Sequence, residues 1–296
     1  MSQEQQTAAP PLHGNANAAV IIPHLNRLDD TRRCCESLAR QTLPPRRIWI
    51  VDNASTAHTQ AELAAACPQA DILRLSVNRG FAGGVNAGIR EALAQPSISY
   101  LWVLNNDTVA APDTLEQLVA AAEADALIGL VGAPLLEGSE DTGRRRVPPG
   151  KHLWKPWAIP VFPRTGQPPD YLSGACLLIR RRLLEDIGSF DDGFFFFFED
   201  ADFSRRAVSK GWRLAVAEGA QIEHLGSATI RRMGELQARS YRAGHVRYLR
   251  KHANHPLGSA LPPFIARLAL DALRLNRAAV RGNWQGWRTA WRQPVT

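Results

Sequence analysis

The chain has 296 residues, of which 45% are hydrophobic and 21% are charged, and this composition excludes intrinsic disorder, a collagen-like repeat and a disulfide scaffold. Its four cysteines form no CxxC pair, which disfavours structural zinc and favours a reducing compartment. No run reaches the ~20 apolar residues that a membrane-spanning helix needs, and residues 1–17 predict a flexible polar leader without the apolar core of a signal peptide. We therefore expect a cytoplasmic protein.

The formal net charge of +7 is unevenly distributed along the chain. Residues 229–296 carry 13 basic and two acidic side chains, whereas the preceding 228 residues carry 22 basic and 26 acidic ones. Such a basic tail suits an anionic membrane surface or another polyanion. The alternative is a basic helical face that contacts only solvent.

Short apolar runs alternate with helical stretches in the first 123 residues. The runs that predict strands are 18–23, 47–52, 71–77 and 100–105. The stretches that predict helices are 28–40, an alanine-rich segment that ends at residue 66, 84–94 and 113–123. This alternation predicts an α/β fold with a mostly parallel sheet flanked by helices, in which ligands collect at the carboxyl ends of the strands.

The alternation stops at residues 137–170, which are rich in Pro, Gly and Arg and predict a long loop. It resumes afterwards and leads into a helical region. The expected strands are 171–179, 212–217 and 220–224, and the expected helices are 181–187, 201–210, 235–252 and 264–281. We predict three parts: the leader over 1–17, an α/β domain over 18–230 and a basic helical C-terminal extension over 231–296.

Polar groups stand where three of the predicted strands end, at Pro23, Asp52 and the segment Asn105-Asn106-Asp107. The Asp107 carboxylate could hold Mg²⁺ or Mn²⁺, with diphosphate oxygens and water completing the coordination shell. It could equally cap the helix that follows or form a turn. The glycine-rich segment 78–88 could offer backbone N–H groups to phosphates, or could be a turn that lets a helix pack closely.

Two further candidates lie in the second half of the chain. Glu199 and Asp200 follow five consecutive phenylalanines, and desolvation beside that apolar surface would raise a carboxyl pKa and tune a base. The alternative is that both acids only favour the start of a helix. His224 alone is more often a structural residue, and a partner such as Asp107 would be needed to make it a ligand.

Taken together, these segments resemble the family 2 glycosyltransferases of the GT-A fold, with a Rossmann-like sheet, and most of all the bacterial rhamnosyltransferase-type enzymes of surface-polysaccharide assembly. The resemblance covers about 18–230, and its pieces follow one another in the family's order. They are VIIPHLNR (20–27), IVDNAST (50–56), NRGFAGGVNAGI (78–89), LNNDT (104–108), SGACLLIRR (173–181), FDDGFFFFFEDADFSRRA (190–207), GWRLA (211–215) and EHLGSAT (223–229).

The resemblance implies a single inverting displacement in which Asp200 is the catalytic base and Glu199 supports it. It also implies that Asp107 and His224 bind Mg²⁺ or Mn²⁺, although Asn105 stands where the family's DxD motif has its first acid. Asp52 matches the acid that contacts a pyrimidine base. The implied donor-binding residues are Pro23, Asn26, Asp52, Arg79, Gly83, Asn86, Asn105 and Asn106.

The partners follow from the same resemblance. The expected donor is a dTDP or UDP sugar, with dTDP-rhamnose favoured by the branch, and the expected acceptor is a lipid-linked saccharide or a polysaccharide of the cell envelope. A sugar-phosphate nucleotidyltransferase is an alternative, but it would need a basic glycine-rich loop after the first strand, where PHLNRLDD stands. A nucleic-acid-binding protein would leave Asp52, Asp107 and Asp200 unexplained, so we expect no nucleic-acid partner.

Residues 264–281 predict an amphipathic helix. Its apolar stripe consists of Ile265, Leu268, Ala272, Leu275 and Ala279, and Trp284, Trp287 and Trp291 continue at helical spacing. A basic face, an apolar stripe and tryptophans together favour peripheral docking on the inner face of the cytoplasmic membrane. The alternative is that the stripe packs on the α/β domain or on a second subunit in a homodimer.

Overall fold

A computed structural model describes residues 16–138, 143–163, 167–224 and 234–295. Most of the leader expected over 1–17, the end of the motif at 223–229 and the domain boundary expected at 230 lie outside these ranges. Within them, no helix is long and apolar enough to cross a membrane.

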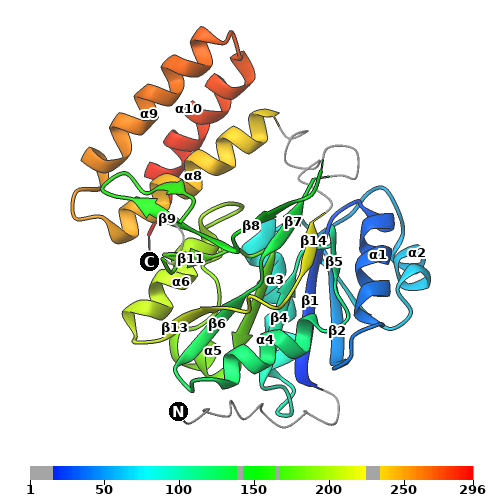
Figure 1. The fold of residues 1–296 in the computed structure, drawn as a ribbon. Coiled ribbons are helices and arrows are strands. Elements are labelled where there is room, and N and C mark those ends of the chain that lie inside the picture. The colour runs from blue at the N-terminus through cyan, green and yellow to red at the C-terminus, as the bar shows by residue number, and fades with distance from the viewer. Residues whose placement is uncertain (1–15, 139–142, 164–166, 225–233, 296) are drawn as a thin grey trace, which may run out of the picture.

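The core of the fold is a seven-stranded sheet in the order β13-β6-β12-β4-β1-β2-β3 (Figure 1). Its strands are β1 (Ala16–His24), β2 (Pro45–Asp52), β3 (Asp71–Arg74), β4 (Tyr100–Leu104), β6 (Ile128–Gly132), β12 (Cys176–Arg180) and β13 (Arg213–Val216). Strand β12 runs antiparallel to both of its neighbours, β4 and β6, whereas all other neighbouring pairs are parallel. The predicted α/β fold with a mostly parallel sheet is therefore confirmed.

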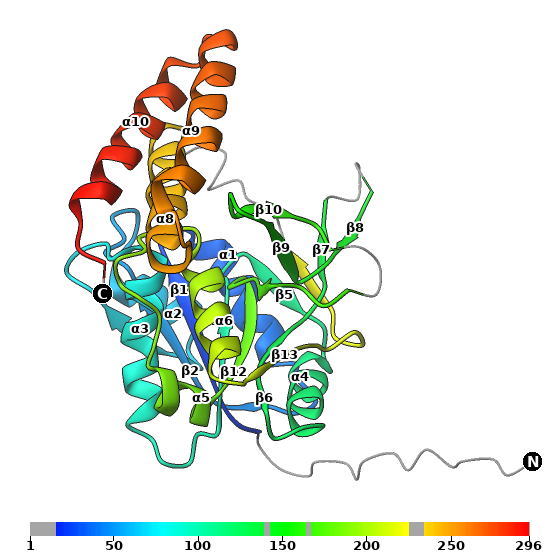
Figure 2. The same cartoon turned by 90° about the vertical axis from the view of Figure 1, so that its left-hand side faces the viewer.

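Helices cover both faces of this sheet (Figures 1 and 2). On one face Val20 and Ile22 of β1 pack in a core with α1 (Leu28–Leu38), α2 (Gln60–Ala66) and α4 (Thr114–Glu123). On the other face Ile21 packs in a second core with α3 (Gly80–Leu93), α5 (Arg181–Ile187) and α6 (Glu199–Ser209). Successive strand residues point to opposite faces, so an uninterrupted apolar run fills both cores.

The glycine-rich segment is helical for most of its length, since α3 begins at Gly80, four residues before the predicted start at 84. The helix lies close against the sheet. A Cβ atom at Gly88 would stand 2.6 Å from Ile21 Cγ2 and 3.2 Å from Val51 Cγ2. Close packing of a helix on strands thus accounts for this glycine.

The prediction of a long loop over 137–170 is wrong, because much of this segment forms short strands. Strands β7 (Leu135–Glu137) and β8 (Arg145–Val147) join β5 (Thr108–Ala110) and β14 (Ile222–His224) in a sheet of order β5-β14-β7-β8. Strands β9 (Gly150–Trp154) and β10 (Ile159–Val161) form a second small sheet with β11 (Tyr171–Leu172). Strands of two to five residues are too short to show a clear hydrophobic period.

Three helices form the C-terminal part, α8 (Gly234–His252), α9 (Pro256–Leu273) and α10 (Arg277–Arg292), and they gather at one end of the molecule (Figures 1 and 2). The single helix predicted over 264–281 is wrong. Leu275 has a left-handed φ of +55°, and the Asn276 side chain accepts a hydrogen bond from the Ala279 backbone N–H as the next helix begins. The stripe is consequently divided between α9 and α10.

The tryptophans of α10 do not form one exposed row. Trp287 stacks on Phe264 of α9 with ring centroids 4.2 Å apart, and Trp291 packs beneath the Arg250 guanidinium of α8. These contacts show that Trp287 and Trp291 pack between the C-terminal helices, which the sequence analysis did not anticipate. Docking of the C-terminal helices on a membrane or on a second subunit stays a prediction.

Helices α8 and α10 touch backbone to backbone at two glycines. A Cβ atom at Gly282 would stand 2.3 Å from the Glu235 carbonyl oxygen, and one at Gly286 would stand 2.3 Å from that of Arg239. Gly258 of α9, by contrast, has only the His255 Cβ within 4 Å, at 3.9 Å.

We therefore expect Gly282→Ala to lower the free energy of unfolding by about 1–3 kcal/mol through overpacking. The matched variant Gly258→Ala should raise it by about 0.5–1 kcal/mol, because alanine favours a helix over glycine where there is room. Urea denaturation of both variants measures this, and equal effects of the two substitutions would contradict the described packing.

Candidate active site

The carboxyl ends of β1 and β2 carry the first cluster of expected site residues. Asp52 is fully buried; its Oδ1 accepts a hydrogen bond from the Ser55 backbone N–H (2.9 Å), and its Oδ2 lies 3.0 Å from Arg74 Nη1. Asn26 connects the two strand ends, since its Oδ1 accepts hydrogen bonds from the backbone N–H groups of Thr56 (2.7 Å) and Ala57 (2.9 Å). The cluster thus presents a fixed carboxylate beside a guanidinium.

His24 belongs to this cluster although the sequence analysis did not select it. Its Nδ1 lies 2.6 Å from Thr31 Oγ1, and its Nε2 lies 2.6 Å from His58 Nε2. Burial lowers the pKa of His24 to about 4, against the opposing charge of Asp52, so the ring is neutral near pH 7. Pro23 precedes it and pairs with Val51 across the two strands. A lone histidine gives no sequence signal, which explains why it was missed.

The residues expected in a donor-binding loop have different positions. The Arg79 backbone N–H donates to Asn53 Oδ1 (2.8 Å), and the Asn53 side chain in turn donates to the Gly80 carbonyl (2.7 Å). Gly83 lies inside α3, where a Cβ would stand 2.7 Å from the Arg79 Cβ. Arg79 therefore lies at the start of α3, beside the Asp52 cluster. Because Gly83 has no Cβ, the Arg79 side chain can pack along this helix.

Asn86 is buried in α3 and contacts the segment before the phenylalanine run. Its Nδ2 donates to the Phe190 carbonyl (2.8 Å) and to the Asp192 carboxylate, and its Oδ1 accepts from the Phe190 backbone N–H (3.1 Å). The structure therefore places Asn86 as a support for that segment and does not bring it to the cavity that Asp200 lines.

Asp107 and His224, which are 117 residues apart in sequence, meet because β14 pairs with β5 and sets His224 opposite Thr108. His224 Nε2 lies 3.4 Å from Asp107 Oδ1, and its Nδ1 lies 3.5 Å from Glu137 Oε1. Burial lowers the pKa of His224, but the hydrogen bond and charge of Asp107, together with Glu137, more than offset it and leave this pKa raised. Glu137 was missed because it lies in the segment expected to be a loop.

These oxygen and nitrogen donors fit Mg²⁺ or Mn²⁺. Asn105 lines the same cavity as His224, while the Asn106 side chain is turned to Thr31, to whose Oγ1 it donates (2.9 Å). No three His, Cys, Asp or Glu side chains of the described ranges converge as a ready-made metal site. A cation here would therefore need further ligands, and the oxygens of a diphosphate are suited to supply them.

Glu199 and Asp200 form the first turn of α6, directly after two strained residues. Phe197 and Phe198 both have left-handed backbones, with φ of +73° and +71°. Asp200 Oδ2 accepts a hydrogen bond from the Gly174 N–H (3.3 Å) and Oδ1 accepts one from the Ala201 N–H (2.8 Å). Backbone strain of this kind is stored at functional sites when the surrounding structure enforces it.

The two acids differ in their pKa values. Burial raises the pKa of Asp200 to about 6, and the two backbone hydrogen bonds limit the rise. Burial and the neighbouring Asp200 charge raise the pKa of Glu199 well above its usual range, and its Oε2 is a buried atom without a hydrogen-bond partner among the described residues. Asp200 is thus an ionised acceptor of protons near pH 7, whereas Glu199 has the more strongly raised pKa of the two.

One cavity of about 350 Å³ joins the two groups of residues. His224 and Asn105 line one part of it, and Glu199 and Asp200 line another, with Lys151 contributing a cation. Phenylalanines 196–198 supply an apolar wall. His224, one of the two expected metal ligands, therefore shares this cavity with Asp200, the expected base. Asp107 is not in its lining, and Asp52 and Asn26 lie at adjoining strand ends outside it.

Helix α8 fixes the segment that carries the acids. Asp191 lies 2.9 Å from Arg247 Nη2 and 2.7 Å from Lys251 Nζ, and Asp202 lies 3.0 Å from the same lysine nitrogen and 2.8 Å from His252 Nε2. Burial alone would raise the pKa of Asp202, but His252, Arg206 and Lys251 together lower it to about 2. The chain is therefore clamped to α8 on both sides of Asp200.

Comparisons with known proteins identify the family of this chain. The sequence model of glycosyl transferase family 2 matches residues 19–188, more than half of the chain, and that of glycosyl transferase family group 2 matches residues 159–281. The chain belongs to glycosyl transferase family 2. This family 2 glycosyltransferase is 27% identical over 227 residues to the N-acetylglucosaminyl-diphospho-decaprenol L-rhamnosyltransferase of Mycobacterium tuberculosis, covering 68% of the chain and 72% of that protein.

Solved glycosyltransferases share its fold. The mannosyltransferase PcManGT from Pyrobaculum calidifontis, in complex with GDP-Man and Mn²⁺, matches 97% of the chain and 88% of its own with a TM-score of 0.58 at 18% identity. GalNAc-T7 with UDP, GalNAc and Mn²⁺ matches 95% of the chain and 57% of its own with a TM-score of 0.63 at 15% identity. At these identities the likeness shows the fold, and the expected GT-A architecture is confirmed.

We expect His224→Ala to weaken Mn²⁺-dependent binding of a nucleoside diphosphate about tenfold or more, because one of two adjoining metal donors is lost. Titration calorimetry with dTDP and UDP, each with Mn²⁺ or with EDTA, measures the effect. His152→Ala in β9 is the matched control and should leave both affinities unchanged. An unchanged Mn²⁺-dependent affinity in His224→Ala would exclude His224 as a ligand.

Proposed function

We propose that this enzyme is an inverting glycosyltransferase that moves a sugar, with rhamnose from dTDP-rhamnose as the favoured donor, to a hydroxyl of a lipid-linked saccharide in cell-envelope glycan synthesis. The observation that carries this proposal is the shared cavity. Its lining includes the buried Asp200 and also His224, whose Nε2 lies 3.4 Å from Asp107 Oδ1. Transfer from a nucleotide sugar needs these two things in one place: a base for the acceptor and donors for a metal–diphosphate.

The donor half of the site lies at the carboxyl ends of β1, β2 and β4. Asp52 would accept a hydrogen bond from a pyrimidine base, and Asn26 and Arg79 would border the nucleoside where they fix the adjoining turns. Asp107 and His224 would hold Mg²⁺ or Mn²⁺ together with the donor diphosphate. When bound, the cation neutralises negative charge on the leaving nucleoside diphosphate.

The acceptor half is the start of α6. Asp200 would take the proton of the acceptor hydroxyl while that oxygen forms a bond to the anomeric carbon and the bond to the nucleoside diphosphate breaks. A positioned carboxylate typically contributes ~10²–10⁴-fold to such a step. Burial and the Asp200 charge raise the pKa of Glu199, which disfavours a second negative charge beside Asp200, and the phenylalanine wall would keep water away from the reacting atoms.

The relative from Mycobacterium tuberculosis supports the choice of substrates. Its name specifies transfer of L-rhamnose to N-acetylglucosaminyl-diphospho-decaprenol, a sugar joined through a diphosphate to a lipid. The basic C-terminal helices of the present chain suit an acceptor of that charge. We therefore propose the same chemical class of acceptor, and a place of action at the cytoplasmic face of the membrane where such lipids are used.

We expect Asp200→Asn to lower the rate of sugar transfer by about 10²-fold or more while the affinity for the nucleoside diphosphate stays unchanged. The amide keeps the shape of the side chain and removes its basicity. Glu199→Gln, which keeps the shape of the side chain, should cost much less and serves as the matched control. Transfer rates and nucleotide affinities of both variants decide this, and a reversed order of the two losses would move the base to Glu199.

A further inference from the structure

A cavity of about 660 Å³ lies among the C-terminal helices, next to the acceptor side of the active site. Helices α8, α9 and α10 and strand β10 all contribute to its lining. Phe197 and Tyr241 line both this cavity and the one that contains Asp200. A molecule extending from Asp200 past these two rings would therefore enter it.

A buried arginine, Arg242, contributes a positive charge to the lining of this cavity. Arg242 of α8 is only 3% exposed, and no carboxylate of the described residues lies within ion-pair distance of its guanidinium. Burial lowers the pKa of Arg242 to about 10, which leaves it charged near pH 7. A buried charge without a paired opposite charge costs several kcal/mol, so such an arginine calls for an anionic ligand.

Neighbouring groups orient Arg242 without neutralising it. It donates to Asn283 Oδ1 (3.2 Å), to His245 Nδ1 (3.1 Å) and, at 3.5 Å, to the Pro263 carbonyl. Burial lowers the pKa of His245 to about 4, so its ring is neutral; it accepts from Arg242 and donates from Nε2 to the Trp157 carbonyl (2.7 Å). An arginine has five N–H donors, and these contacts leave some of them for a ligand.

A second guanidinium lines the same cavity. Arg267 of α9 is 48% exposed, and its Nε lies 2.9 Å from Asp271 Oδ2. The Asn283 side chain also donates to this carboxylate (3.0 Å). Asp271 thus pairs with Arg267 alone, while Arg242 is connected to it only through Asn283. The two guanidinium groups keep a net positive charge, and their geometry matches that of phosphate oxygens.

We propose that the cavity around Arg242 and Arg267 binds the diphosphate of a lipid-linked acceptor, whose sugar then reaches Asp200. This inference rests on the proposed function. Helix α9 also presents exposed apolar side chains at a spacing of four, Leu257, Leu261 and Ile265, which lie outside the lining of this cavity.

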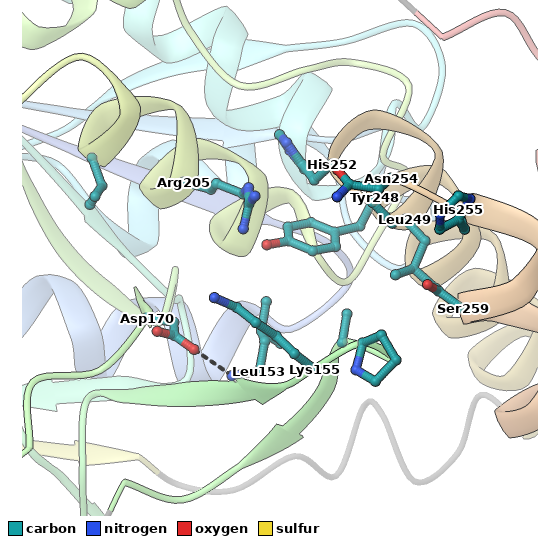
Figure 3. Close-up of a pocket in the computed structure, with 14 residues that line it drawn as sticks. Leu153, Lys155, Asp170, Arg205, Tyr248, Leu249, His252, Asn254, His255 and Ser259 are labelled. Carbon is teal, nitrogen blue, oxygen red and sulfur yellow. Dashed lines mark hydrogen bonds between the residues drawn. The ribbon is translucent and has the colours of Figure 1, made fainter.

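The cavity shown in Figure 3 has neither a buried arginine nor a lining residue in common with the cavity that contains Asp200. It has a volume of about 520 Å³ and lies between β9, α6 and the junction of α8 and α9. Its two cations, Lys155 and Arg205, are exposed, so water solvates them and they need no bound anion. Arg205 is accordingly a matched control for the arginines of the other cavity.

Steady-state kinetics with two acceptors tests the proposal. One acceptor carries N-acetylglucosamine on a short-chain lipid diphosphate, and the other carries the same sugar as an alkyl glycoside without phosphate. Arg267→Gln and Arg242→Gln should each raise KM for the diphosphate acceptor about tenfold or more, the loss expected for a charged hydrogen bond. KM for the glycoside and for the donor should stay unchanged, and Arg205→Gln should change none of them.

A binding measurement keeps the proposal testable apart from transfer. Calorimetry with farnesyl diphosphate in zwitterionic detergent should show binding by the wild type that both arginine variants weaken about tenfold and Arg205→Gln leaves intact. Arg267 is half-exposed, so its variant stays informative even if Arg242→Gln unfolds. No binding by the wild type, an equal loss in Arg205→Gln, or equal affinity for inorganic pyrophosphate would overturn the proposal. Retained binding without any sugar transfer would overturn only the proposed function.

Discussion

The burial of two adjacent carboxyl groups, Glu199 and Asp200, is the constraint on which the rest of the site depends. Both cannot be ionised in an apolar setting without a large cost. The N–H groups of Gly174 and Ala201 stabilise the charged form of Asp200, whereas Glu199 Oε2 has no such donor among the described residues and the pKa of Glu199 is raised well above its usual range. The fold thereby produces one base, Asp200, at the N-terminal end of α6, where the helix dipole also favours a negative charge.

Residues from several elements in the second half of the chain hold Glu199 and Asp200 in place. The left-handed backbones of Phe197 and Phe198 cost about 1–3 kcal/mol each and persist only where neighbouring contacts enforce them. Lys251 of α8 supplies such contacts, because its Nζ lies 2.7 Å from Asp191 and 3.0 Å from Asp202. We infer that α8 is part of the catalytic unit, although the sequence analysis assigns residues 231–296 to a separate extension.

The sequence predicted the sheet and the chemical type of the site better than it predicted where the individual helices and strands begin and end. Uninterrupted apolar runs predicted β1, β2, β4 and β12, but no strand was predicted at β6, which lies between β13 and β12 in the sheet. The family motifs pointed to Asp107, His224 and Asp200. The motifs gave no reason for Glu137, whose role depends on pairing between strands of three residues. Nor could hydrophobic spacing show the end of α9, which a left-handed Leu275 determines. Such features depend on contacts between distant segments and not on local pattern.

The pH dependence of sugar transfer tests the central claim most directly, because kcat/KM reports the ionisation of the free enzyme. A base that must be deprotonated, with a pKa raised by burial to about 6, predicts that kcat/KM rises about tenfold per pH unit below pH 6 and levels off above it. A plateau reached already near the ordinary aspartate value of 3.8 would contradict the account, since Asp200 would then be solvated or would not be the base.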